Sequence, residues 1–318
     1  MIIVPIVIFI VSCFLLLIVG KLVIESLMRI AKFLEWREFV LSFFIIALAS
    51  SIPNFFVGIF SAIQGIPLLS FGDIVGSNVI NLTLAIAIPV LISNGIQVKS
   101  RVAQKTSFFT MLCAILPLIL LLDKKLSRSD GLLLILFFFI YVAWLFSKEE
   151  RFKLVYDGEN PYKTIGFKMF LIDIGRIILG IALLLIAAEG IVFSVTDFAK
   201  FLKMPLFLIG IFIVGIGSSL PEIYFSITSS KKGESWMVLG SLMGSIIILS
   251  TLILGTVCLI SPIEFSDFSP FVIACIFQFI GALFFFWFIR TDRKITRREG
   301  LILLGIFILF LIVEMFLR

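Results

Sequence analysis

Long apolar runs fill most of this sequence, and they constrain its fold more than any other feature. A helix rises about 1.5 Å per residue, so about 20 apolar residues cross the ~30 Å hydrocarbon layer of a membrane. Runs close to or above this length occur ten times, at 2–28, 38–63, 68–93, 106–122, 130–147, 167–196, 205–230, 236–260, 269–289 and 299–317. The sequence therefore predicts an all-α integral membrane protein with ten transmembrane helices.

The composition supports this prediction and excludes several classes of protein. Hydrophobic residues make up 61% of the 318 residues and charged residues only 14%, whereas soluble domains contain roughly 25% charged residues. Such a chain could not cover a soluble surface, so we expect neither a soluble enzyme nor a nucleic-acid partner. Histidine is absent, which excludes His-dependent catalysis and His–metal sites.

One polar stretch, 148–163, divides the apolar runs into five and five. We therefore expect a first unit over 1–147, a short cytoplasmic linker over 148–166 and a second unit over 167–318. Lys and Arg favour short cytoplasmic loops. If both termini lie outside, inner loops contain 18 of these residues, while outer loops and the C-terminus contain 6. The sequence thus predicts a multi-pass protein of the cell membrane with both termini outside.

The two units resemble each other. At an offset of 168 residues, 31–85 and 199–253 share 19 identities without a gap. Shared Pro, Gly and Ser residues carry the match, as in SSIP at 50–53 and SSLP at 218–221. Five spans separate each element from its counterpart, and five is odd, so the copies cross the bilayer in opposite directions. Such inverted-topology repeats are typical of secondary transporters, whose substrate site lies near the midplane between the repeats.

A proline interrupts one span of each copy. Pro53 and Pro221 lack an N–H, which frees the carbonyl oxygens of Ala49 and Gly217. In hydrocarbon an unsatisfied carbonyl is costly unless a partner such as a desolvated cation compensates it. A structural kink would suffice to explain one proline. Two prolines at the repeat offset, each beside a serine pair, favour an ion site.

Polar side chains recur at helical spacing around these prolines and on the span that follows each of them. The predicted cation ligands are hydroxyl, amide and carboxyl groups and the two freed carbonyls: Ser51, Asn54, Asp73, Ser77, Asn81, Ser219, Glu222, Ser245, Ala49 and Gly217. Oxygen ligands suit hard cations such as Na⁺ and Ca²⁺. Glu222 lies deep in an apolar run, where a carboxylate needs a partner or an ion, and a snorkelling interfacial acid is the alternative. Asp73 fits either an ion ligand or an interfacial cap, because it lies nearer the start of its span.

These repeated segments resemble the cation/calcium exchanger superfamily, which includes sodium/calcium exchangers. GSSLPE at 217–222 is similar to the GTSLPE motif of that family, and GDIVGSNVIN at 72–81 is similar to its GNxxGSNxxN/D motif. The resemblance extends to LSRSDGLLL at 126–134 and covers nearly the whole chain. It implies antiport of Ca²⁺ against Na⁺ or H⁺ by alternating access, without a cofactor. It also implies that the first and sixth spans slide against a core of the second, third, seventh and eighth.

The same resemblance assigns roles residue by residue. Glu222 matches the acid of the second Pro motif and Asn81 the amide of the first Gly-Ser motif. The hydroxyl positions of the family match Ser51, Ser77, Ser219 and Ser245. Antiport would then couple the ions through competition for the single carboxylate of Glu222.

Several positions depart from the family pattern. Asn54 replaces an acid, Ile246 an Asn, and Leu249 an Asn or Asp, while Asp73 stands where Asn is usual. Ca²⁺ usually needs more than one carboxylate to offset its dehydration. We therefore expect weaker Ca²⁺ binding than in the family, or a shift to monovalent cations or protons.

Two other classes of protein stay open at this point. A non-transporting membrane scaffold would explain the lost ligands, and it predicts no effect of cations on thermal stability, whereas a transporter should show one. An intramembrane hydrolase would need a base for one of the paired serines, and none is evident near Ser50 or Ser218. The oligomeric state is open, and a monomer is compatible with the sequence.

Overall fold

The computed structural model describes residues 3–33, 38–98, 101–146, 167–233, 235–265, 269–291 and 293–316. The helices of the first half are α1 (Ile3–Phe33), α2 (Glu38–Ile63), α3 (Pro67–Leu82), α4 (Leu84–Ile92), α5 (Arg101–Leu120) and α6 (Arg128–Phe146). Those of the second half are α7 (Phe167–Leu202), α8 (Leu206–Ile209), α9 (Ile216–Lys231), α10 (Ser235–Ile247), α11 (Leu254–Ile260), α12 (Ser269–Arg290) and α13 (Arg297–Phe316). The predicted linker over 148–166 lies outside the described residues.

Short segments join some of these helices. A 3₁₀ turn, η1 (Leu121–Asp123), follows α5, and two π-helical segments, η3 (Gly210–Gly215) and η4 (Ile248–Ile253), interrupt the second half. Four two-residue strands complete the secondary structure: β1 (Ile96–Gln97), β2 (Lys125–Leu126), β3 (Ile263–Glu264) and β4 (Lys294–Ile295).

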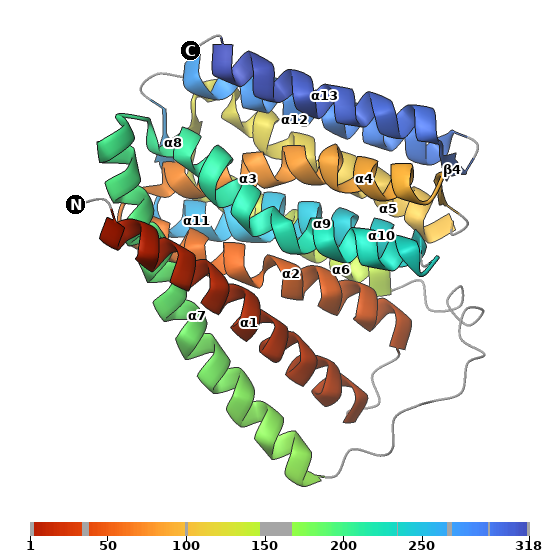
Figure 1. Cartoon of the computed structure of the whole chain (residues 1–318), viewed down its shortest axis with the longest axis horizontal. Helices are drawn as coiled ribbons and strands as arrows, with labels where there is room; N and C mark the ends of the chain where they lie inside the picture. Colours follow the sequence, from red (N-terminus) through yellow and green to blue (C-terminus); the bar gives the residue numbers. More distant parts are fainter. Residues whose placement is uncertain are drawn as a thin grey trace.

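Together these elements form the ten transmembrane helices that the sequence predicts (Figure 1). Three of the ten are composite: α3 continues into α4, α8 runs through η3 into α9, and α10 runs through η4 into α11. Within the described residues, seven stretches can cross a membrane by length and composition: Pro67–Ile92, Ala103–Asp123, Arg128–Leu145, Met169–Leu202, Leu206–Lys231, Met237–Ile260 and Phe271–Arg290. Helices α1, α2 and α13 are the other three of the ten transmembrane helices.

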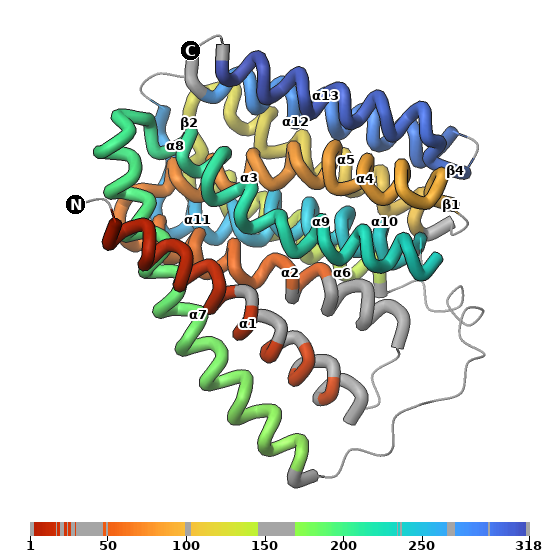
Figure 2. Tube along the Cα trace, in the orientation of Figure 1, coloured from red at the N-terminus to blue at the C-terminus, as the bar shows by residue number. Residues whose placement is uncertain are grey.

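The strand pairs show how the two halves relate. β1 pairs with β4 and β2 with β3, both antiparallel, so each pair joins the first half to the second. Ile96 faces Ile295 in one pair, and Leu126 faces Ile263 in the other. The β1–β4 pair lies at the opposite end of the bundle from β2 (Figure 2). Exchanging the halves therefore maps one pair onto the other, as an inverted repeat requires.

The helices that close the two halves begin with the same capping arrangement. The Asp130 carboxylate accepts hydrogen bonds from the Ser127 amide at 2.7 Å and its hydroxyl at 2.6 Å. The Glu299 carboxylate does the same for Thr296, at 2.6 and 2.8 Å. Such a capping box satisfies the free N–H groups of a first helical turn. Two equivalent caps show that the repeat extends beyond the matching segments 31–85 and 199–253 to the first turns of α6 and α13.

Helices α1 and α7 lie along one edge of the bundle and pack against each other (Figure 1). Val19 and Val23 of α1 join Leu184 and Ala188 of α7 in a buried apolar cluster. The faces that α1 and α7 turn away from the bundle are apolar and exposed, with Ile10, Phe14, Ile178 and Ile186 among them. An exposed apolar face of this kind suits contact with lipid.

An ion pair also joins these two helices. The Arg29 guanidinium donates to the Asp173 carboxylate at 2.8 and 2.9 Å, and Arg176 reaches the same carboxylate at 3.1 Å. The Ser26 hydroxyl accepts a further bond from Arg29 at 3.1 Å. The buried acid of α7 is therefore neutralised by a residue of α1.

Candidate cation site

Close backbone packing positions the candidate site. A Cβ atom at Gly76 of α3 would lie 2.9 Å from the Cα of Ile211, and one at Gly210 would lie 2.5 Å from the carbonyl oxygen of Leu69. Only glycine leaves room for such an approach of two helical backbones. The contact brings the Ser77 hydroxyl within 3.4 Å of the Gly215 carbonyl oxygen.

The first part of the site surrounds Asp73, whose side chain has no exposed surface. Its carboxylate accepts a hydrogen bond from the Ser218 hydroxyl at 2.9 Å, from the Asn54 amide at 3.3 Å and from the Ser77 hydroxyl at 3.4 Å. The Asn54 amide also donates to Ser218 at 3.1 Å, and the hydroxyls of Ser77 and Ser218 are 3.1 Å apart. Asp73 thus lies inside the bundle, which agrees with an ion ligand better than with an interfacial cap.

The second part surrounds Glu222, which is 2% exposed and does not face lipid. The Ser245 hydroxyl donates to its carboxylate at 3.4 Å. Ser245 in turn lies 3.3 Å from the Ser51 hydroxyl, which donates to the Ala47 carbonyl oxygen at 2.9 Å. A snorkelling position for Glu222 does not fit this burial.

The two parts form one polar ring across four helices. Ser51 and Asn54 lie one turn apart on α2, and Ser218 and Glu222 lie one turn apart on α9. Helices α2 and α9 therefore each contribute one residue to the hydrogen bonds around Asp73 and another to those around Glu222. In each part, the proline helix of one half meets the Gly-Ser helix of the other, α9 with α3 and α2 with α10. We call this set the polar ring: Ser51, Asn54, Asp73, Ser77, Ser218, Glu222 and Ser245.

Several polar atoms in and beside the ring are buried without a hydrogen-bond partner. Within the described residues these include one oxygen each of Asn54 and Glu222 and the hydroxyl of Ser219. Both polar atoms of the Asn81 amide are also unpaired, and its side chain has no exposed surface. Buried polar groups are normally paired, because leaving one unsatisfied is costly. Unpaired oxygens beside two carboxylates are the environment that a desolvated cation would stabilise.

The structure confirms the two prolines within their helices, but it does not test whether the carbonyls that they free bind a cation. Pro53 and Pro221 lie inside α2 and α9, as predicted. The carbonyls that receive serine hydroxyls, however, are those of Ala47 and Gly215, two residues before Ala49 and Gly217. Binding of a cation by the Ala49 and Gly217 carbonyls stays a prediction.

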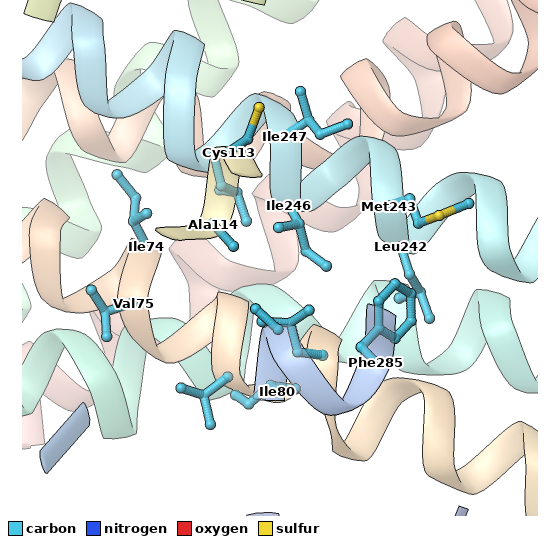
Figure 3. Packing of buried hydrophobic residues seen from close by; sticks show 14 of the residues in the cluster. Ile74, Val75, Ile80, Cys113, Ala114, Leu242, Met243, Ile246, Ile247 and Phe285 are labelled. Atoms are coloured by element: carbon cyan, nitrogen blue, oxygen red, sulfur yellow. The ribbon is translucent and has the colours of Figure 1, made fainter. Parts of the chain in front are cut away.

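Two positions of the second half are apolar where the first half is polar. Ile246, the counterpart of Asn78, packs in a buried cluster with Ile80, Ala114 and Phe285 (Figure 3). Leu249, the counterpart of Asn81, is 1% exposed and belongs to the same cluster. At these two positions the second half therefore has buried apolar side chains in place of the amides that could bind a cation.

Our sequence reading missed two polar contacts. It selected the second serine of the SSLP segment, whereas Ser218, the first, makes the bonds to Asp73 and Asn54. The position of Ser218, four residues before Glu222, was the available signal. It also overlooked Asn78, whose amide donates to the Ser250 hydroxyl at 2.8 Å and joins α3 to η4.

An inverted pair of five-helix halves with a buried polar ring between them is an arrangement typical of secondary transporters. The profile of the sodium/calcium exchanger protein family matches residues 4–147 and 172–316. The chain therefore belongs to the sodium/calcium exchanger family, a family of transporters rather than enzymes. It is a multi-pass integral membrane protein.

Relatives and solved structures agree with this assignment. The sodium/calcium exchanger MaX1 of Methanosarcina acetivorans is 26% identical to this chain, in an alignment that covers 91% of this chain and 92% of the relative. The inner membrane protein YrbG of Escherichia coli is 26% identical over 286 residues, which cover 84% and 83%.

Two solved exchangers share the fold. The H⁺/Ca²⁺ exchanger CAX has a TM-score of 0.81 at 17% identity, over 98% of this chain and 82% of the other. The sodium-calcium exchanger NCX_Mj has a TM-score of 0.67 at 22% identity, over the whole of both chains. At these identities the likeness concerns the fold alone.

Proposed function

We propose that the protein is a secondary active antiporter that exchanges Ca²⁺ for Na⁺ or H⁺. The observation that carries the proposal is the polar ring, which joins two buried carboxylates across both repeats inside an apolar membrane core. Buried intramembrane acids are costly, and they typically mark ion pathways. The named activities of MaX1, NCX_Mj and CAX support Ca²⁺ as the shared ion and leave Na⁺ and H⁺ as its exchange partners.

The ring would act as the site that both ions share. A cation entering it replaces its hydration shell with the oxygens of Glu222, Asp73 and the ring hydroxyls, with Asn54, Asn81 and Ser219 supplying the unpaired atoms nearby. One pair of carboxylates cannot fully compensate a Ca²⁺ ion together with Na⁺ or H⁺. Binding of one ion type therefore excludes the other, and this competition couples their movements, provided that affinity differs between the inward and outward states.

The alternative within the same family is exchange restricted to monovalent cations or protons. The apolar packing of Ile246 and Leu249 favours it, because Ca²⁺ takes six to eight oxygen ligands and these two positions offer none. Robust Ca²⁺ transport would exclude this alternative.

We further propose that both termini face the outside of the cell membrane. The positive charge of the loops supports this orientation, and the start of α1 and the end of α13 lie on the same side of the bundle (Figure 1). The relative YrbG, an inner membrane protein, supports the cell membrane. The division into units over 1–147 and 167–318 is part of the same proposal.

A thermal-shift series tests the proposed function. The purified protein would be titrated with Na⁺, Ca²⁺, K⁺ and pH, together with Glu222→Gln and a control, Glu189→Gln, whose acid is exposed on α7. A cation that binds the folded state raises the melting temperature. We expect Ca²⁺ and Na⁺ to stabilise wild type and Glu189→Gln but not Glu222→Gln. Equal melting curves with and without every cation would support a non-transporting scaffold instead.

A further inference from the structure

The number of acidic side chains in the polar ring limits the charge that it can bind. Asp73 and Glu222 are its two acids. The other buried acids of the described chain are Asp173, which pairs with Arg29, and Glu314, which lies on α13 outside the four central helices. In the same residues, no three Asp, Glu, His or Cys side chains come together. The ring therefore offers two carboxylates and not three.

No basic side chain of the four central helices neutralises this pair. The described parts of α2, α3, α9 and α10 contain one Lys or Arg, which is Lys231, exposed at the end of α9. Neutral donors alone surround Asp73, and the hydroxyls of Ser245 and Ser50 are the neighbours of Glu222. Within these four helices, charge balance therefore comes from bound cations, protons included.

The two acids also have separate sets of oxygens. Asp73 lies with the hydroxyls of Ser77 and Ser218 and beside the carbonyl of Gly215, which both hydroxyls approach. Glu222 has the Ser245 hydroxyl, one oxygen without a partner, and Ser245 in contact with Ser51. Each carboxylate thus has the neighbours to hold one monovalent cation.

We propose that the polar ring binds a load of two positive charges, as one divalent or two monovalent cations, so that exchange is electroneutral. This inference rests on the proposed antiport function and assigns its stoichiometry. A third monovalent ion would leave a net positive charge in the apolar core, where Ile246 and Leu249 provide no ligand. A single monovalent ion would leave one carboxylate without compensation.

The test uses the full chain reconstituted in liposomes and loaded with Na⁺. Uptake of radiolabelled Ca²⁺ would be driven by the outward Na⁺ gradient, while K⁺ and valinomycin set the potential to inside-negative, zero or inside-positive. We expect the same initial rate at all three potentials and two Na⁺ released per Ca²⁺ taken up. Uptake that is faster at inside-positive potential, as three Na⁺ per Ca²⁺ require, or faster at inside-negative potential, as one Na⁺ per Ca²⁺ requires, would overturn the inference while leaving antiport intact, and so would a measured ratio other than two. Absence of Ca²⁺ uptake in every condition would instead refute Ca²⁺ antiport, and the inference with it.

A pair of variants links the load to the ring. Asp73→Asn removes one of the two charges, and we expect it to lose the electroneutral exchange of two Na⁺ for one Ca²⁺. Glu189→Gln removes an exposed acid of α7 and should keep both the ratio and the independence from potential. An unchanged ratio in Asp73→Asn, or a changed one in Glu189→Gln, would contradict the assignment. The wild-type flux ratio and its response to potential decide the question if Asp73→Asn does not fold.

Discussion

The two repeats contribute to the polar ring in different ways. In the first repeat the acid lies on the Gly-Ser helix α3, as Asp73, and the proline helix α2 carries the neutral Asn54. In the second repeat the acid lies on the proline helix α9, as Glu222, and the counterpart of Asp73 is Ser241. Because the helices meet crosswise, both acids still reach one ring. A repeat can therefore move its charge between helices without losing the shared site.

The surroundings of the two acids differ as well. Asp73 accepts hydrogen bonds from three neutral donors, whereas Glu222 accepts one and keeps an unpaired oxygen. A carboxylate with several donors is partly compensated before any ion arrives. Glu222 has more to gain from a cation, so the second repeat should dominate ion affinity although the first contains more polar residues.

The largest effect that follows from this comparison is at Glu222. Glu222→Gln removes the less compensated charge. We expect Ca²⁺ affinity to fall about 100-fold, because a charge-assisted contact contributes about 1.5–3 kcal/mol. Isothermal titration of the purified protein measures it. Affinity within a factor of about two of wild type, well under 1 kcal/mol, would exclude Glu222 as a ligand.

Asp73→Asn should have a smaller effect on the same titration. Its three donors already stabilise the charge, so we expect Ca²⁺ affinity to fall about 10-fold, equivalent to about 1.4 kcal/mol. If Asp73→Asn lost more Ca²⁺ affinity than Glu222→Gln, the first repeat would dominate ion affinity, which would contradict this comparison of the repeats.

The comparison extends to the long helices outside the ring. Asp173→Asn leaves Arg29 without its acid, and because that pair is partly exposed we expect a loss of about 1–2 kcal/mol in stability. Thermal unfolding measures the loss, and Ca²⁺ affinity should not change. Asp197→Asn is the matched control, since Asp197 forms an exposed pair with Lys200 at 3.9 Å. Equal losses in the two variants would show that the α1–α7 ion pair stabilises little.

The smallest effects should be equal in the two repeats. Ser127→Ala and Thr296→Ala each remove the hydroxyl of a helix cap, which typically costs about 1 kcal/mol. Because the caps of α6 and α13 share one geometry, thermal unfolding should give similar losses, additive in the double variant. A loss confined to one cap would break the equivalence of the repeats at their outer helices.

Much of the fold could be read from the sequence because membranes impose simple rules. The length of the apolar runs gave ten helices, and recurring Pro, Gly and Ser gave the repeat. The sequence also indicated Glu222, since an acid deep in an apolar run needs a partner. It left Asp73 between two roles, because distance along a span does not reveal which neighbours a helix meets.

The sequence by itself thus determined the membrane setting, the repeat and the types of ligand, all of which depend on composition and spacing along one chain. Only the tertiary structure decided which side chains meet: Ser218 with Asp73, Ser51 with Ser245, and Arg29 with Asp173. Each of these contacts joins helices from different halves, more than 140 residues apart. Such pairings depend on how closely two helix backbones approach each other, as α3 and η3 do at Gly76 and Gly210, and periodicity within a single helix carries no information about that distance.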